Sequence, residues 1–253
     1  MKILIASTPA TGHLNPLLAI GRILLSEGHE IVVLSGSAFR KRVEAIGAKF
    51  RPFPANADFD LSDFDAVAPE LKAIPPGLEQ RRARRERVFV DPIPAQHEGL
   101  QQVLEGFPAD VVIADDMFFG VLPMLLGQHS NRPPVVLCGT SILHCHRPDG
   151  APIFLGLPPA TTQAQLREYA VIAQDYREAV DQPVALRLNR LLASLGVGPL
   201  SMPLFEAVIE YADAYMQLAA PSFEFPREIP PSVHFVGVLP ILPNQAPLPD
   251  WAP

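Results

Sequence analysis

The stretch ILIASTPATGHLNP, residues 3–16, decides the fold of this 253-residue chain. Its first four residues are apolar and predict a buried β-strand that breaks at the following proline. A glycine-bearing loop follows, and then a helix with Asn15 as N-cap and Pro16 in the first turn, where a missing N–H costs nothing. The helix is expected to stop at Gly28. His13 is therefore expected in the loop at the carboxyl end of the first strand, which is the edge where open α/β sheets bind ligands.

The rest of the chain alternates between strand-like and helix-like segments that are joined by short turns. This alternation predicts an α/β fold with a Rossmann-like, doubly wound parallel sheet of about seven strands. The further strands are expected at residues 30–34, 49–52, 109–116, 134–139, 214–218 and 233–236. The helices are expected at residues 38–46, 78–104 (interrupted by two prolines), 117–126, 163–176 and 184–195.

Prolines crowd the last thirty residues, and from Pro240 onward the sequence suits neither a helix nor a central strand. Such a composition is typical of a semi-rigid, extended linker. We therefore expect one Rossmann-like domain over residues 1–238 and a Pro-rich linker over residues 239–253.

The composition excludes several classes of function. A net charge of -7 and a pI of about 5.5 argue against nucleic acid as the main partner. No run reaches the roughly 18 apolar residues of a membrane helix, so no membrane insertion is expected. Cys138 and Cys145 have neither metal-site spacing nor a disulfide framework, and a reducing cytoplasm fits best. One local basic cluster is interpreted as a solvated helix face, or alternatively as a contact surface for an anionic ligand or a partner domain: Arg81, Arg82, Arg84, Arg85 and Arg87.

His13 and Asp115 each follow the carboxyl end of a predicted strand, and in the usual doubly wound order these two strands are neighbours. A carboxylate bonded to one imidazole nitrogen fixes the tautomer, so that the other nitrogen can accept a proton from a hydroxyl or a water. The alternative is that each residue only caps a helix. Asp116 can replace Asp115 in the pairing, because predicted boundaries err by a residue or more.

Two other motifs are candidate ligand sites. The sequence around Gly12 lacks both the G-x-G-x-x-G spacing and the lysine of a P-loop, so it does not predict a phosphate cradle. His144, Cys145 and His146 are adjacent in the chain and cannot all face one ion, and no fourth ligand lies at helical spacing. We interpret them as part of a polar loop that lines a cleft, and we expect no metal.

Apolar and soft side chains follow several strand ends on the same edge as His13. Core packing explains each of them singly. Together they can line an apolar pocket with a few polar groups, which is the usual make-up of a small-molecule site. These residues are Phe89, Met117, Phe118, Phe119, Leu143 and Phe154.

The sequence TGHLNP, residues 11–16, after a first strand, together with VVIAD, residues 111–115, resembles the N-terminal half of two-domain (GT-B) nucleotide-sugar-dependent glycosyltransferases. The resemblance extends from Lys2 to the Pro-rich tail. It is to the UDP-glycosyltransferase-like enzymes that modify macrolides, flavonoids and other lipophilic acceptors.

The resemblance implies a division of labour in which the N-terminal domain holds the acceptor and the C-terminal domain holds most of the nucleotide sugar. It implies that His13 is the general base, that Asp115 pairs with it, that attack inverts the anomeric centre, and that no metal or cofactor is needed. The predicted acceptor site comprises Thr11, Gly12, Phe89, Met117, Phe118, Phe119, Thr140, Ser141, Leu143, His144 and Phe154.

The chain departs from the family in lacking its nucleotide-binding signature, a His-Cys-Gly-Trp-like run, since the one tryptophan is Trp251 in the tail. We therefore expect residues 240–253 to lead toward an absent second domain, and the chain alone to bind acceptor weakly and transfer no sugar. The alternative is a non-catalytic auxiliary or binding module that complements a separate catalytic chain and docks through the arginine cluster. A nucleotide-sugar epimerase half would need further cleft carboxylates, which the sequence does not identify.

Overall fold

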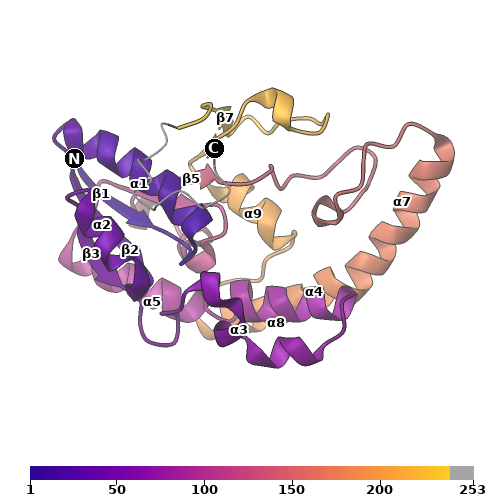
Figure 1. Ribbon diagram of the computed structural model, residues 1–253, viewed down its shortest axis with the longest axis horizontal. Coiled ribbons are helices and arrows are strands. Elements are labelled where there is room, and N and C mark those ends of the chain that lie inside the picture. Colours follow the sequence, from indigo (N-terminus) through magenta and orange to yellow (C-terminus); the bar gives the residue numbers. More distant parts are fainter. Residues whose placement is uncertain (240–253) are drawn as a thin grey trace, which may run out of the picture.

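The computed structural model describes residues 1–239, whose core is a seven-stranded, all-parallel sheet (Figure 1). The strand order is β3-β2-β1-β4-β5-β6-β7, so the predicted Rossmann-like α/β sheet is confirmed. The strands are β1 (Lys2–Ala6), β2 (Glu30–Ser35), β3 (Lys49–Pro52), β4 (Val111–Asp115), β5 (Val135–Gly139), β6 (Ala214–Gln217) and β7 (Val233–Phe235).

Helices connect the strands, and α7 extends well away from the sheet (Figure 1). Segments of π-helix, Glu86–Val90 and Arg177–Asp181, follow α4 and α7 directly. The α-helices of the described residues are α1 (Thr11–Ser26), α2 (Arg40–Ala45), α3 (Phe64–Val67), α4 (Leu78–Arg85), α5 (Ile93–Gly106), α6 (Leu122–Leu125), α7 (Gln163–Tyr176), α8 (Gln182–Ser194) and α9 (Leu204–Tyr211). Within residues 1–239, the helices are too short or too polar to cross a bilayer.

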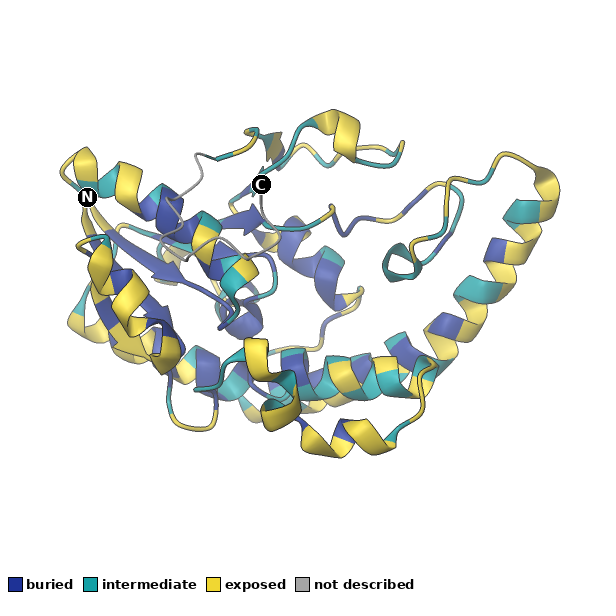
Figure 2. Cartoon of the chain, in the orientation of Figure 1, coloured by how far each residue is buried: buried dark blue, intermediate teal, exposed yellow. Residues whose placement is uncertain are grey.

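Two apolar layers cover the two faces of the sheet, because successive side chains of a strand point to opposite faces. On β1, Ile3 and Ile5 face the layer that includes the buried residues of α1, whereas Leu4 and Ala6 face the layer built from α5, α6, α8 and α9. The central strands β1, β2, β4 and β5 are accordingly mostly buried, whereas the edge strands β3 and β7 and the outer helix faces are more exposed (Figure 2). This double coverage explains why β1, β2, β4 and β5 are largely apolar runs.

The chain reverses its direction of winding at β1, whose two neighbours are β2 and β4. The predicted adjacency of the first strand and the strand that carries Asp115 is therefore present. Their carboxyl ends meet at the point where the strand order switches, and in open parallel sheets this is the crevice that receives ligands.

The predicted start of the first helix was wrong. The helix begins at Thr11, with Ala10 as an extended N-cap residue that has no side-chain cap, and the N–H groups of His13 and Leu14 both bond the Ala10 carbonyl. Pro16 is inside the helix but removes only one intrahelical hydrogen bond. His13 is consequently in the first helical turn and not in the preceding loop.

Other boundaries also differ from the sequence expectation. The helix expected over residues 117–126 shrinks to a 3-10 turn and the four residues of α6. Residues 61–73, for which the sequence predicted no helix, contain short helical segments, and α9 was not predicted either. Of the expected linker, residue 239 is described and residues 240–253 lie outside the described part of the chain, so the division into domain and linker stays a prediction.

Candidate active site

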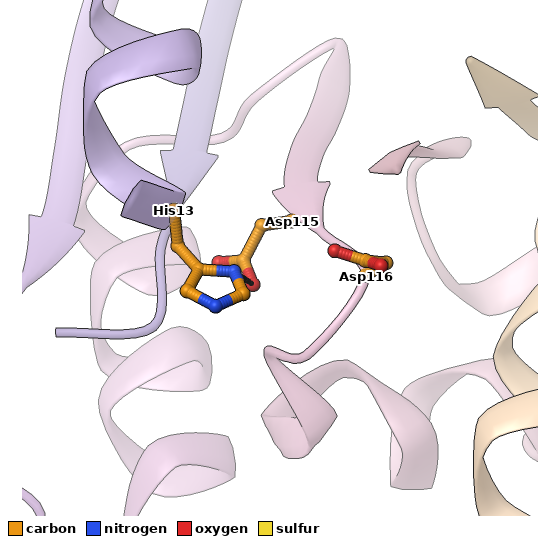
Figure 3. Close-up of side chains that lie close together, drawn as sticks. All are labelled: His13, Asp115 and Asp116. Atoms are coloured by element: carbon orange, nitrogen blue, oxygen red, sulfur yellow. Dashed lines mark ion pairs between the residues drawn. The ribbon is translucent and has the colours of Figure 1, made fainter. Parts of the chain in front are cut away.

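His13 and Asp115 are brought together by the parallel pairing of β1 with β4. Asp115 is the last residue of β4, and His13 lies in the first turn of the helix that follows β1. The Nδ1 atom of His13 is 3.0 Å from Oδ1 of Asp115 (Figure 3). The Asp115 side chain is fully buried, whereas that of His13 keeps 17% of its surface exposed. The imidazole can therefore meet a ligand, and the carboxylate behind it cannot.

Asp115 is surrounded by hydrogen-bond donors. Its Oδ2 accepts from the Thr8 backbone N–H at 2.6 Å, and its Oδ1 accepts from the Thr8 hydroxyl at 2.9 Å and from the Met117 N–H at 3.0 Å. Burial alone would raise the pKa of Asp115, but the charge and hydrogen bond of His13 and these backbone donors hold it below its usual value. Asp115 is thus a carboxylate at neutral pH.

The ionised Asp115 determines which nitrogen of His13 carries the proton. A carboxylate can only accept, so the hydrogen lies on Nδ1 and the lone pair on Nε2. Figure 3 shows the second ring nitrogen directed away from Asp115. Burial alone would lower the pKa of His13, but the charge and hydrogen bond of Asp115 and the charge of Asp116 outweigh it and raise the pKa. The geometry therefore gives a strengthened base at Nε2.

Asp116 does not pair with His13 directly but belongs to a second polar group beside it. Its Oδ1 accepts from the backbone N–H and the hydroxyl of Thr140, at 3.2 and 2.9 Å. Its Oδ2 lies 3.3 Å from the Ser141 hydroxyl and 3.7 Å from Nδ1 of His144. Burial and the neighbouring charge of Asp115 raise the pKa of Asp116 to about 6.

The side chains of His13, Asp115 and Asp116 are also close enough together to be considered as a cation site. One ligand atom from each of His13, Asp115 and Asp116 lies within 4.8 Å of the others. The oxygens, however, already accept hydrogen bonds from the Thr8, Met117 and Thr140 groups described above, and a cation on Nδ1 would displace the proton that bonds Asp115. The hydrogen bonding favours proton transfer over metal binding at this cluster.

A pocket of about 280 Å³ begins one side chain away from this cluster. His144 lines it, and the Nε2 atom of His144 is 3.2 Å from the Ser141 hydroxyl. Burial, followed by the charges of nearby arginines, lowers the pKa of His144 to about 4, so its ring is neutral. Most of the wall is apolar and includes Ile153, Phe154, Val184, Leu188, Leu200, Met202, Leu204 and Phe205.

Arg85, at the end of α4, contacts several residues of the pocket wall. Its guanidinium carbon lies 4.4 Å from the ring centre of Phe154, 5.2 Å from that of Tyr176 and 5.1 Å from that of Phe205. Its Nη1 is 2.7 Å from Oδ1 of Asp181, and only 11% of the Arg85 side chain is exposed. The interpretation of the arginine cluster as a solvated face therefore fails at Arg85.

We expect Arg85→Ala to lower the free energy of unfolding by about 2 kcal/mol, because it removes a largely buried guanidinium from three rings. Arg84→Ala is the matched control: Arg84 is exposed and lies over a single ring, that of Phe64, at 4.7 Å. Its loss is expected to be about 0.5–1 kcal/mol. Urea unfolding of the three proteins measures both values, and equal losses would contradict this account.

The other residues of the predicted acceptor site have varied positions. Phe118 and Phe119 are buried core residues: Phe118 stacks on Phe53, and Phe119 packs edge-to-face with Phe89 and Phe205. Leu143 is also fully buried and Met117 packs against the same core. The Thr11 hydroxyl accepts a bond from Arg42 at 3.1 Å, and Gly12 is exposed with open space beside its α-carbon. Acceptor binding by these residues stays a prediction.

The loop residues considered as metal ligands separate in the structure. His144 is buried and His146 is exposed, and burial raises the pKa of Cys145 to about 11. Sequence reasoning did not identify Arg85, Tyr176, Asp181 and Phe205 as pocket residues. The only signal was the arginine cluster, and its pattern alone does not tell which arginine faces inward.

No family model matches the chain, but curated relatives and solved structures do. The chain is 32% identical to the 4'-demethylrebeccamycin synthase of Lentzea aerocolonigenes, covering 99% of this chain and 59% of that protein. It is 34% identical to UDP-glycosyltransferase 2 of Phaeomoniella chlamydospora, covering 98% of this chain and 56% of that protein. The chain thus spans little more than half the length of these relatives.

Solved glycosyltransferase structures share the fold. The glycotransferase of kitacinnamycin superposes with a TM-score of 0.60 at 16% identity, covering 100% of this chain and 54% of that one. CalG4, the calicheamicin glycosyltransferase, gives a TM-score of 0.59 at 20% identity, covering 94% of this chain and 52% of that one.

The fold and the sequence relationships define a class. The chain has the fold of the N-terminal half of a GT-B glycosyltransferase. It is related in sequence to UDP-glycosyltransferases and to natural-product glycosyltransferases.

Proposed function

We propose that this chain is the acceptor-binding half of an inverting, nucleotide-sugar-dependent glycosyltransferase that acts on hydroxyl groups of lipophilic small molecules. The observation that carries the proposal is the 3.0 Å contact between His13 Nδ1 and buried Asp115 at the crevice of the sheet. The relatives named above, which include a rebeccamycin-type synthase and a UDP-glycosyltransferase, support it.

In the proposed mechanism, Nε2 of His13 accepts the proton of the acceptor hydroxyl. The oxygen forms its bond to the anomeric carbon while the bond from that carbon to the nucleoside diphosphate breaks, and both electrons of the broken bond leave with the diphosphate. Asp115 stabilises the imidazolium that forms on His13. A single displacement of this kind inverts the anomeric centre and needs no covalent enzyme intermediate. The nucleotide sugar is held mainly by a second domain, which we place after a linker at residues 239–253.

The pocket lined by His144 and Phe154 is the proposed site of the acceptor. Its apolar wall suits a lipophilic molecule, and its volume of about 280 Å³ falls near the lower end of small-molecule sites. The neutral His144, which lines the pocket, can hydrogen-bond the acceptor without adding charge. A cytoplasmic location, expected from the two cysteines, stays a prediction.

We expect the full-length protein to transfer sugar from a nucleotide sugar to a hydroxylated lipophilic acceptor with inversion at the anomeric carbon. The present chain alone is expected to bind the acceptor weakly and to transfer no sugar, because the proposed second domain would supply most contacts to the nucleotide sugar in the transition state. The anomeric coupling constant in the proton NMR spectrum of the product shows its configuration. Calorimetry on the present chain measures its affinity for the acceptor. Retained configuration would refute the single displacement.

The runner-up function is a non-catalytic binding module that complements a separate catalytic chain. The same pocket favours it, since acceptor binding does not need a base. The two proposals separate in one assay: the full-length protein that carries this chain binds the acceptor in both cases, but only an enzyme half supports turnover that His13 controls.

A further inference from the structure

The hydroxyl of Thr140 lies midway between His13 and the second carboxylate. Thr140 is the first residue after β5, and Asp116 is the first after β4. The Thr140 Oγ1 atom is 2.9 Å from His13 Nδ1 and 2.9 Å from Asp116 Oδ1. Because these strands are neighbours in the sheet, the three groups meet at the same edge as the pair of His13 and Asp115.

The direction of each hydrogen bond follows from proton counting. Nδ1 of His13 already carries a hydrogen, because it faces the ionised Asp115, so it cannot accept one from Thr140. The single hydroxyl hydrogen of Thr140 therefore goes to Asp116, and the Thr140 oxygen is an acceptor for Nδ1–H. The Nδ1–H of His13 is thus shared between Asp115 and Thr140.

Asp116 is held in place for this contact. Its backbone N–H bonds the Cys138 carbonyl at 3.0 Å, and its Oδ1 also accepts from the Thr140 backbone N–H. The side chain is 1% exposed. The titratable groups that face it come from every neighbouring element: His13 of α1, Asp115 of β4, Cys138 of β5, His144 of the loop after β5 and Tyr215 of β6.

We propose that Thr140 and Asp116 are positioning residues for the general base: Asp116 orients the Thr140 hydroxyl, and Thr140 holds the Nδ1–H of His13 together with Asp115. The catalytic lone pair on Nε2 is then fixed by two acceptors on the far side of the ring, and not by Asp115 alone. This inference rests on the proposed function for its catalytic meaning, but the hydrogen-bond arrangement stands independently of it.

The arrangement gives a role to the buried carboxylate of Asp116, which the pair of His13 and Asp115 does not include. The pKa of Asp116 is raised to about 6 by burial and by Asp115, so it is ionised at pH 7 and above. Its negative charge then adds to that of Asp115 in favouring protonation of His13. Nothing in this step requires Asp116 to touch the substrate.

Two matched substitutions at Thr140 test the proposal. Thr140→Val keeps the shape but removes the hydroxyl, whereas Thr140→Ser keeps the hydroxyl. In the full 253-residue chain, nitrogen-15 NMR of the imidazole rings reports the tautomer and pKa of His13, and its signals are assigned by their loss in His13→Gln. We expect the Val variant to lower the His13 pKa by roughly one unit, and the Ser variant to retain it.

Asp116→Asn gives a second measurement, because it removes the charge while keeping the size, and we expect it to lower the His13 pKa as well.

In the full-length protein, Thr140→Val is expected to lower kcat about tenfold with acceptor KM unchanged. The inference would be overturned if the His13 pKa in Thr140→Val equalled that of the wild type. It would also be overturned if Thr140→Ser lowered the His13 pKa as much as Thr140→Val does. Since NMR needs no turnover, a failure of the transferase assignment would show separately, as absent sugar transfer.

Discussion

Replacing His13 with alanine is expected to lower kcat for sugar transfer by roughly 10²–10⁴-fold in the full-length protein, the usual contribution of a positioned general base. The acceptor hydroxyl would then lose its proton only to water. Stability should change little, because the side chain is partly exposed and Asp115 keeps three other donors. Initial rates with saturating substrates, together with circular dichroism melting curves, measure both effects.

His129→Ala is the matched control for the loss of an imidazole. His129 lies outside the candidate site, is 70% exposed, and bonds Asp213 at 2.6 Å. We expect it to leave kcat within about twofold of the wild-type value, as for surface substitutions in general. If His13→Ala retained near-wild-type kcat, the assignment of the base would be wrong.

Asp115→Ala is expected to have the second largest effect, because it acts on both folding and rate. The N–H groups of Thr8 and Met117 lose their buried acceptor, and the Nδ1–H of His13 keeps only the Thr140 oxygen. Each buried donor left without a partner costs about 1–3 kcal/mol. The rate should fall by a smaller factor than for His13→Ala, since Asp115 orients the base and does not transfer the proton itself.

Asp115→Asn separates the effect of the charge from the effect of side-chain size, because Asn is nearly as large as Asp but uncharged. The amide keeps an oxygen that can accept from Thr8, so the Asn variant should be the more stable of the two at pH 7. The pKa of Asp115 in the folded protein lies below its usual value of 3.8. The ionised carboxylate therefore contributes its full stabilisation at pH values well above 3.8. This stabilisation is lost as the pH falls through the lower folded pKa. Urea unfolding should therefore show the gap between wild type and Asn narrowing at acid pH, and a gap that stays constant would contradict the charge pairing.

The sheet was predictable because its central strands β1, β2, β4 and β5 are largely apolar runs separated by turns, a pattern typical of buried parallel strands. Residues 49–52 were placed at their exact bounds. The neighbouring positions of β1 and β4 followed from the doubly wound topology, and with them the approach of His13 to Asp115.

Helix starts and side-chain directions were less predictable, for physical reasons. Ala10 caps α1 without a side-chain hydrogen bond, so no capping residue marked the true start, while Asn15 and Pro16 imitated one. Arg85 and Arg84 are adjacent and chemically identical, and only tertiary packing decides that one lies over three rings and the other over one. The role of Thr140 as a bridge depends on distances across three elements, which a single sequence does not encode locally.

The central claim is that neutral His13, strengthened by Asp115, removes the acceptor proton, and the pH dependence of kcat/KM tests it most directly. His13 must be unprotonated to act, and its pKa is raised above 6.5, so activity should fall with decreasing pH along a limb whose midpoint lies above 6.5. In His13→Gln, the residual activity should lack this limb. The same acid limb at the same midpoint in both proteins would contradict the claim, because the group that titrates would then not be His13.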